Sequence, residues 1–104
     1  MIPKWTTDEL QRKLEQGEKI NLIDVREQEE WEEGHIAEAR HIPLSQLAER
    51  YEECKSGEEP IVLICRSGNR SGKACDFLHE LGYPVVNVEG GMLAWQGPVT
   101  RGAN

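Results

Sequence analysis

The residues with the clearest chemical potential are a cysteine and the small, polar residues that follow it. Cys65 comes directly after the apolar run at 61–64, which is typical of a short strand buried on both faces. The next positions include Ser67, Gly68, Asn69 and Ser71. Such residues let the chain turn tightly, so that successive backbone N–H groups point at one place and stabilise an anion there. A helix predicted over about 71–81 directs the positive end of its dipole at the same place.

The distribution of charge favours a thiolate at Cys65. The chain carries a formal net charge of −7, yet positions 60–75 contain no Asp or Glu and include Arg66, Arg70 and Lys73. Such surroundings lower the pKa of a thiol from about 8.5 into the range of roughly 3.5 to 7.5, and the thiolate is the nucleophilic form. The alternative is a small, buried apolar cysteine, which is the commoner role after such a strand. The turn, the arginines and the helix start together favour the reactive thiolate.

Four segments, in order along nearly the whole chain, resemble a known family. Cys-Arg-Ser-Gly-Asn-Arg-Ser at 65–71 resembles the active-site loop of the rhodanese family of sulfurtransferases, in which the cysteine accepts a sulfane sulfur as a persulfide. Segments 23–26, 31–43 and 89–95 resemble the other signatures of that family. Glu38 departs from the pattern, because the family often has Gly there. The resemblance implies an α/β, rhodanese-like fold with a mostly parallel five-stranded sheet and helices on both faces.

The resemblance also implies a reaction. The Cys65 thiolate is expected to attack the sulfane sulfur of a donor such as thiosulfate, release sulfite, and pass the sulfur to a thiophilic acceptor such as cyanide. Backbone N–H groups of the loop are expected to stabilise the persulfide, and Arg66 and Arg70 to attract the anionic donor. The predicted substrate-binding residues are Arg66, Ser67, Gly68, Asn69, Arg70 and Ser71. No metal and no organic cofactor is expected.

Two other functions remain open from the sequence. Cys-dependent phosphatases have a similar loop with five residues between Cys and Arg, whereas four residues separate Cys65 from Arg70. The smaller ring is expected to suit a sulfur atom better than a phosphoryl group. The other alternative is a sulfur-carrier or binding module whose acceptor is a thiol-bearing protein. The expected partners are therefore a small-molecule sulfur donor and acceptor, or a protein thiol.

The elements that position the loop alternate between strands and helices. Apolar patterns predict strands over about 20–25, 39–42, 61–64 and 85–88. They predict helices over about 7–16, 27–31, 45–51 and 71–81, with a short last helix opened by Gly90 and Gly91. Ser45 is predicted to cap its helix, Phe77 and Leu81 to lie on an apolar stripe, and the chain after 96 to be loosely held. This alternation predicts right-handed parallel crossovers.

Asp24 and Arg26 are predicted to support the loop. They lie at the carboxyl end of a predicted strand, the edge of an α/β sheet where ligand crevices form and where Cys65 also lies. Asp24 is interpreted as an ion-pair or turn-capping residue, or as an acceptor for an active-loop arginine. Arg26 is predicted to pair with a nearby carboxylate, with 27–33 supplying the candidates. His35 is interpreted as a hydrogen-bonded anchor rather than as a base for Cys65.

Bulk properties limit the remaining possibilities. The 104 residues fit one rhodanese-like domain spanning 1–104. Net negative charge argues against nucleic acid and anionic membranes as partners. No apolar run reaches the length of a membrane span or a signal-peptide core, which predicts a cytoplasmic protein. Cys54 and Cys75 accompany Cys65 without metal-binding spacing, so no disulfide framework or metal site is predicted, and the sequence assigns neither a redox role.

Overall fold

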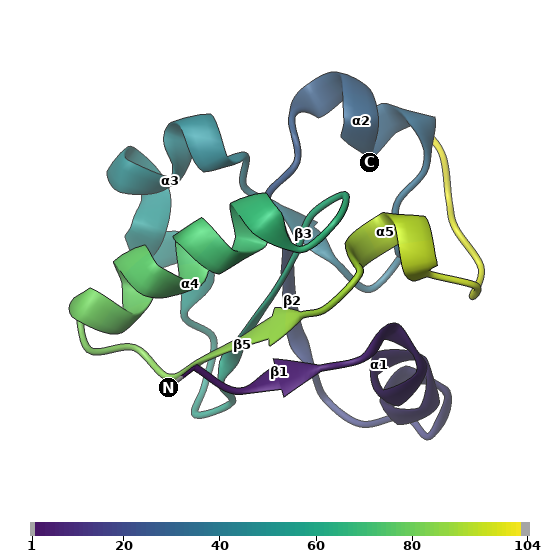
Figure 1. The fold of residues 1–104 in the computed structure, drawn as a ribbon, viewed down its shortest axis with the longest axis horizontal. Helices are drawn as coiled ribbons and strands as arrows, with labels where there is room; N and C mark the ends of the chain where they lie inside the picture. The colour runs from purple at the N-terminus through teal and green to yellow at the C-terminus, as the bar shows by residue number, and fades with distance from the viewer. Residues whose placement is uncertain (1, 103–104) are drawn as a thin grey trace.

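The computed structural model describes residues 2–102 and has an α/β architecture (Figure 1). Its elements, in chain order, are β1 (Lys4–Trp5), α1 (Thr7–Glu15), β2 (Asn21–Asp24), α2 (Gln28–Glu33), β3 (Arg40–His41), α3 (Leu44–Arg50), the 3₁₀ helix η1 (Tyr51–Cys54), β4 (Ile61–Ile64), α4 (Asn69–Glu80), β5 (Val85–Val88) and α5 (Gly91–Ala94). The sheet has the order β1-β5-β4-β2-β3, and every neighbouring pair is parallel. The predicted five-stranded parallel sheet is therefore confirmed. Within residues 2–102, no helix is long and apolar enough to cross a membrane.

Strand β4 lies at the centre of the sheet and carries the candidate nucleophile at its carboxyl end. It pairs with β2 on one side and with β5 on the other, so that all four of its residues are buried. A strand covered on both faces reads as a continuous apolar run, which is why the Ile-Val-Leu-Ile segment could be identified from sequence. Because the strands are parallel, β2, β4 and β5 all end at the same edge of the sheet.

Helices cover both faces of the sheet, as predicted. One face packs against α3 and α4 through a buried cluster that includes Ile23, Leu47, Leu63, Ala74 and Leu78. The other face packs against α1 and α2 through a second cluster that includes Leu10, Leu22, Trp31, Ile64 and Val88. This second cluster is extended by Met92 of α5. The loop after β4 therefore leaves the sheet between two packed layers, which hold it on either side.

Several predicted details are wrong. The fifth strand is β1, which the sequence prediction missed because two residues are too few for an alternating pattern. Helix α3 begins at Leu44 with Pro43 as its N-cap, and the Ser45 hydroxyl donates a 2.9 Å hydrogen bond to Glu27 Oε1 instead of capping the helix. Phe77 and Leu81 are exposed rather than part of the core, since only the side of α4 that carries Leu78 faces the sheet.

The segment after α5 is held in place, which also differs from the prediction. Figure 1 shows it running from α5 towards α2. His35 and Thr100 exchange two backbone hydrogen bonds, of 2.9 and 2.8 Å, and the Gly102 N–H donates to the Glu32 carbonyl oxygen at 3.0 Å. Backbone pairing of this kind leaves no side-chain pattern in the sequence, so composition alone suggested a loose tail. Residues 103 and 104, which that prediction also covered, lie outside the described residues.

Candidate active site

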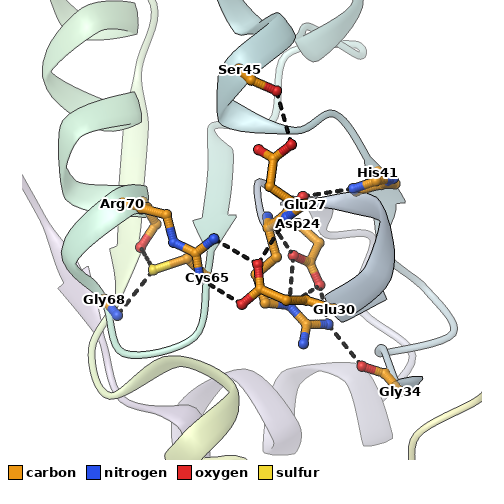
Figure 2. Close-up of polar contacts among 11 residues, drawn as sticks. Asp24, Glu27, Glu30, Gly34, His41, Ser45, Cys65, Gly68 and Arg70 are labelled. Carbon is orange, nitrogen blue, oxygen red and sulfur yellow. Dashed lines mark hydrogen bonds and ion pairs between the residues drawn. The ribbon is translucent and has the colours of Figure 1, made fainter. Parts of the chain in front are cut away.

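The loop between β4 and α4 surrounds the Cys65 sulfur with hydrogen-bond donors. The Gly68 N–H donates to Cys65 Sγ at 3.1 Å, and the Ser71 hydroxyl lies 3.3 Å from the same sulfur (Figure 2). Gly68 has a φ of +102°, a left-handed conformation that glycine adopts without a steric penalty. This conformation ends the turn and starts α4 at Asn69, two residues earlier than predicted. The structure thus brings Cys65, Gly68 and Ser71 together.

Opposing effects determine the protonation of Cys65. Burial raises the pKa of the thiol, but hydrogen bonds from the Ser71 hydroxyl and from the backbone N–H groups of Ser71, Gly68 and Ser67 outweigh burial and bring the pKa below its ordinary value. The direction agrees with the sequence-based prediction. The main cause is the set of hydrogen bonds made by the loop, because each of them is stronger to a thiolate than to a thiol.

The sulfur is recessed, and two hollows adjoin the loop. Only 1% of the Cys65 surface is exposed, whereas Arg66 and Ser67 beside it are exposed. One hollow, of about 290 Å³, is bounded by Arg66, by Glu30 of α2 and by Leu93 of α5. The other, of about 320 Å³, is lined by residues that include Lys4, Gly68, Asn69, Lys73 and Asn87. Arg66 and Asn69, both predicted to bind substrate, therefore face different hollows.

Arg70, which was predicted to attract the anionic donor, is paired with a carboxylate in the structure. Its guanidinium makes two 2.7 Å hydrogen bonds to the Glu30 carboxylate, and so joins α4 to α2 (Figure 2). The Arg70 side chain lowers the pKa of Glu30 to about 2. The pair therefore stays charged throughout the neutral pH range and is lost only as the pH falls towards 2. Much of the positive charge of Arg70 is already compensated before any donor arrives.

Asp24 and Arg26 form a buried ion pair beneath the site. Asp24, with 0% of its surface exposed, accepts hydrogen bonds from Arg26 Nη2 at 2.8 Å and from the Arg26 backbone N–H at 3.0 Å. Arg26 Nη2 also donates to the Gly34 carbonyl oxygen at 2.8 Å. The predicted pairing of Arg26 with a nearby carboxylate and the ion-pair role of Asp24 are thus confirmed, but the carboxylate is Asp24 rather than one of the candidates in 27–33. The Val25 N–H donates to the Ile64 carbonyl oxygen at 2.9 Å, so the turn that this ion pair stabilises contacts the residue before Cys65.

Sequence reasoning missed two further contacts to the loop. From α5, the N–H groups of Met92 and Leu93 donate to the Cys65 and Arg66 carbonyl oxygens at 2.8 and 2.9 Å. From β5, the Asn87 amide donates to the Gly68 carbonyl oxygen at 3.2 Å and accepts a 2.6 Å hydrogen bond from the Ser71 hydroxyl. A lone Asn inside the apolar Val-Val-Asn-Val strand was the signal that could have identified the second contact. Nothing in residue type or spacing pointed to the first.

The remaining candidate side chains, those of His35, Cys75 and Cys54, are all buried. His35 is buried, its ring stacks on Trp31 at a centroid distance of 3.5 Å, and its Nδ1 lies 2.6 Å from the Trp31 carbonyl oxygen, which fits a loop anchor. Burial raises the pKa of Cys75 to about 12 and also raises the pKa of Cys54, so neither favours a thiolate. Over residues 2–102, no group of three His, Cys, Asp or Glu side chains is arranged to hold a metal ion.

Comparisons with known proteins agree with this architecture. Residues 6–98 match the rhodanese-like domain family. The chain is 47% identical over 96 residues to "Putative sulfurtransferase YtwF" of Bacillus subtilis (strain 168), covering 92% of each protein, and 38% identical over 97 residues to "Putative sulfur carrier protein YrkF" of the same organism, covering 52% of that protein. The crystal structure of a rhodanese-like domain protein from Staphylococcus aureus superposes with a TM-score of 0.88 at 34% identity, over 97% of this chain and 99% of that one. The chain therefore belongs to the rhodanese-like domain family.

Proposed function

We propose that the chain is a sulfurtransferase that carries a sulfane sulfur as a persulfide on Cys65. Its family, together with relatives named as a sulfurtransferase and as a sulfur carrier, supports a role in sulfur transfer. The observation that carries the proposal is the Cys65 sulfur itself, which receives hydrogen bonds from the Gly68 N–H and the Ser71 hydroxyl and has a pKa below its ordinary value. Free thiols suit the cytosol, which we propose as the compartment, and all three cysteines are free.

The proposed cycle consists of two displacements at sulfur. In the first, the Cys65 thiolate attacks the sulfane sulfur of thiosulfate, a new S–S bond forms, the donor S–S bond breaks, and sulfite leaves with the electron pair. In the second, cyanide attacks the outer sulfur of the persulfide, thiocyanate leaves, and the Cys65 thiolate returns. The atoms and electrons of donor, cysteine and acceptor balance, so the cycle needs no further reactant.

The loop supplies stabilisation at each step. The Gly68 N–H is fixed before the reaction and the Ser71 hydroxyl oxygen lies 3.3 Å from the sulfur, and a preorganised donor contributes roughly 2.7 to 4 kcal/mol to lowering a barrier at which negative charge develops. Arg66 is exposed and has no ion-pair partner among residues 2–102, so we assign it to the sulfonate end of the donor. Ser67 and Asn69 are included in the proposed substrate-binding loop because of the position of their backbone.

Intact-protein mass spectrometry after incubation with thiosulfate tests the proposal. We expect the protein to gain one sulfur atom and to lose it when cyanide is added. The rate of gain should fall as the pH drops through the pKa of Cys65, because the thiolate fraction falls with it. A protein that gains no sulfur but hydrolyses an aryl phosphate would instead support the phosphatase alternative.

Substitutions of the two members of the Arg70–Glu30 pair should change the KM for thiosulfate in opposite directions. Arg70→Ala removes a cation and leaves Glu30 uncompensated near the loop, so the KM for thiosulfate should rise severalfold, whereas Glu30→Gln frees the guanidinium and should lower that KM. Because the pair is partly exposed, Arg70→Ala should cost less than about 1 kcal/mol of stability. Steady-state kinetics at fixed ionic strength and thermal unfolding measure both.

The matched control for this prediction is Arg50→Ala. Arg50 makes a similar, partly exposed pair with Glu53, through hydrogen bonds of 2.9 and 3.0 Å. Its removal should leave the KM for thiosulfate unchanged. An unchanged KM in Arg70→Ala, or loss of its fold, would contradict the role given to Arg70.

A protein thiol is the second candidate acceptor. The resemblance to a protein named as a sulfur carrier favours it, as does Leu93, which is 66% exposed at the hollow next to Arg66. An exposed leucine at the rim of a reactive loop provides apolar contact area for another protein. Faster loss of the added sulfur to a thiol-bearing protein than to an equal concentration of a small thiol would support this acceptor.

A further inference from the structure

The side chain of Asn87 on β5 contacts both groups that hydrogen-bond to the candidate sulfur. Its Nδ2 donates to the Gly68 carbonyl oxygen at 3.2 Å, and its Oδ1 accepts from Ser71 Oγ at 2.6 Å. The carbonyl group requires a donor, so the amide nitrogen must face Gly68 and the amide oxygen must face Ser71. The orientation of the amide is thereby set by its partners.

Ser71 cannot satisfy both of its neighbours at once. Its hydroxyl has one proton, while Asn87 Oδ1 lies 2.6 Å away and Cys65 Sγ lies 3.3 Å away. When Cys65 is a thiol, the S–H can donate to Ser71 Oγ and the hydroxyl can donate to Asn87. When Cys65 is a thiolate, the charged sulfur is the stronger acceptor and takes the hydroxyl proton. Each protonation state of the sulfur therefore selects a different direction for this proton.

We propose that Asn87 is a positioning residue of the sulfur site, which competes with the Cys65 sulfur for the single hydroxyl proton of Ser71. It acts through Ser71, whose hydroxyl donates to the Asn87 amide oxygen. Ser71 is fully buried, so no solvent can replace its partners, whereas Asn87 is half-buried and lines the hollow of about 320 Å³. The proposal rests on the proposed function only in treating Cys65 as the reacting group.

Other charged or titratable groups lie on the loop and on the elements packed against it, and two of them, Arg70 and Cys75, interact electrostatically with Cys65. The full set comprises the Asp24–Arg26 and Glu30–Arg70 pairs, Arg66, Lys73, Cys75, Asp76, Glu89 and Lys4. Changes at Asn87 and Ser71 leave all of these groups in place. A double-mutant cycle between the two positions therefore cancels their contributions, and it also cancels the separate effect of losing the bond from Asn87 to Gly68.

The test is the pKa of Cys65 in four proteins: wild type, Asn87→Leu, Ser71→Ala and the double variant. The pKa is obtained from the pH dependence of alkylation by iodoacetamide, read from the mass of the peptide that contains Cys65. In the presence of Ser71, Asn87→Leu removes the competing acceptor and should favour the thiolate. Asn87→Leu should therefore lower the pKa of Cys65 further when Ser71 is present than in the Ser71→Ala background. The difference between the two pKa shifts should be about half a unit or more, which is about threefold in the ratio of thiolate to thiol. The same shift in both backgrounds, or a coupling of opposite sign, would overturn the proposal.

Asn87→Asp provides a second arm that also serves if Asn87→Leu does not fold. A carboxylate at this position is a stronger acceptor for the Ser71 proton, so the variant should raise the pKa of Cys65 more when Ser71 is present than in the Ser71→Ala background. An equal increase of the pKa of Cys65 in both backgrounds would show that the added negative charge alone raises it, and would contradict the proposed competition for the Ser71 proton. The alkylation readout needs no sulfur donor. Failure of sulfur transfer and failure of this proposal are thus distinguishable.

Discussion

Cys65→Ser is expected to gain no sulfur from thiosulfate and to lose thiocyanate formation by roughly a thousandfold or more. A serine hydroxyl cannot supply a thiolate at neutral pH and cannot form a persulfide. Because Ser has nearly the shape of Cys and keeps the acceptor for the Gly68 N–H, the loop itself should change little. Intact mass after incubation with thiosulfate, together with colorimetric thiocyanate detection, measures both losses.

The matched control is Cys75→Ala, which removes a buried thiol from α4. Burial raises the pKa of Cys75 to about 12, so this thiol is not available as a nucleophile near pH 7. Cys75→Ala should therefore gain the sulfur atom at the wild-type rate, although its thermal midpoint should fall because it leaves a small cavity. Sulfur gain in Cys65→Ser, or its loss in Cys75→Ala, would remove Cys65 from its proposed role.

Gly91→Ala is expected to lower the free energy of unfolding by about 3 kcal/mol or more and to abolish sulfur gain. Gly91 has a φ of +56°, and a Cβ atom there would press against the Cys65 carbonyl oxygen and lie 2.5 Å from the Arg66 carbonyl oxygen. Those two carbonyl groups accept the hydrogen bonds that α5 donates to the loop. The added methyl group therefore displaces the backbone on which the sulfur depends. Chemical denaturation and the mass assay measure the two effects.

Gly17→Ala separates backbone strain from steric clash. Gly17, at the end of α1, also has a positive φ, +78°, but a Cβ there has no atom within 4 Å. Its substitution should cost about 1 to 2 kcal/mol through conformation alone and leave sulfur gain intact. If Gly91→Ala and Gly17→Ala were equally stable, the close approach of α5 to the loop would not explain why position 91 requires glycine.

The sequence was sufficient for the parts of the fold that are encoded locally. The apolar run at 61–64 identified β4, because a strand covered on both faces is continuously hydrophobic, and the three valines in 85–88 identified β5. The start of α4 was misplaced by two residues, since a left-handed glycine rather than a hydroxyl side chain precedes it. Ser45 was mistaken for a cap because its partner, Glu27, lies 18 residues earlier in the chain.

Most errors in the candidate site also involve partners that are distant in sequence. A run of residues shows that Arg70 is positive, but not that Glu30, 40 residues away, compensates its charge. It shows that Cys65 precedes a tight turn, but not that Asn87 and α5 hold that turn from outside. The local geometry of the loop could therefore be predicted, whereas the contacts that hold and compensate it are tertiary.

The depth at which Cys65 lies sets a requirement on the shape of any macromolecular acceptor. With 1% of its surface exposed, the cysteine cannot meet a thiol carried on a flat or broad protein face. An acceptor must present its thiol on a narrow projection, such as a protruding loop or a flexible chain end. By the same geometry, two copies of this protein cannot readily join their Cys65 residues in a disulfide.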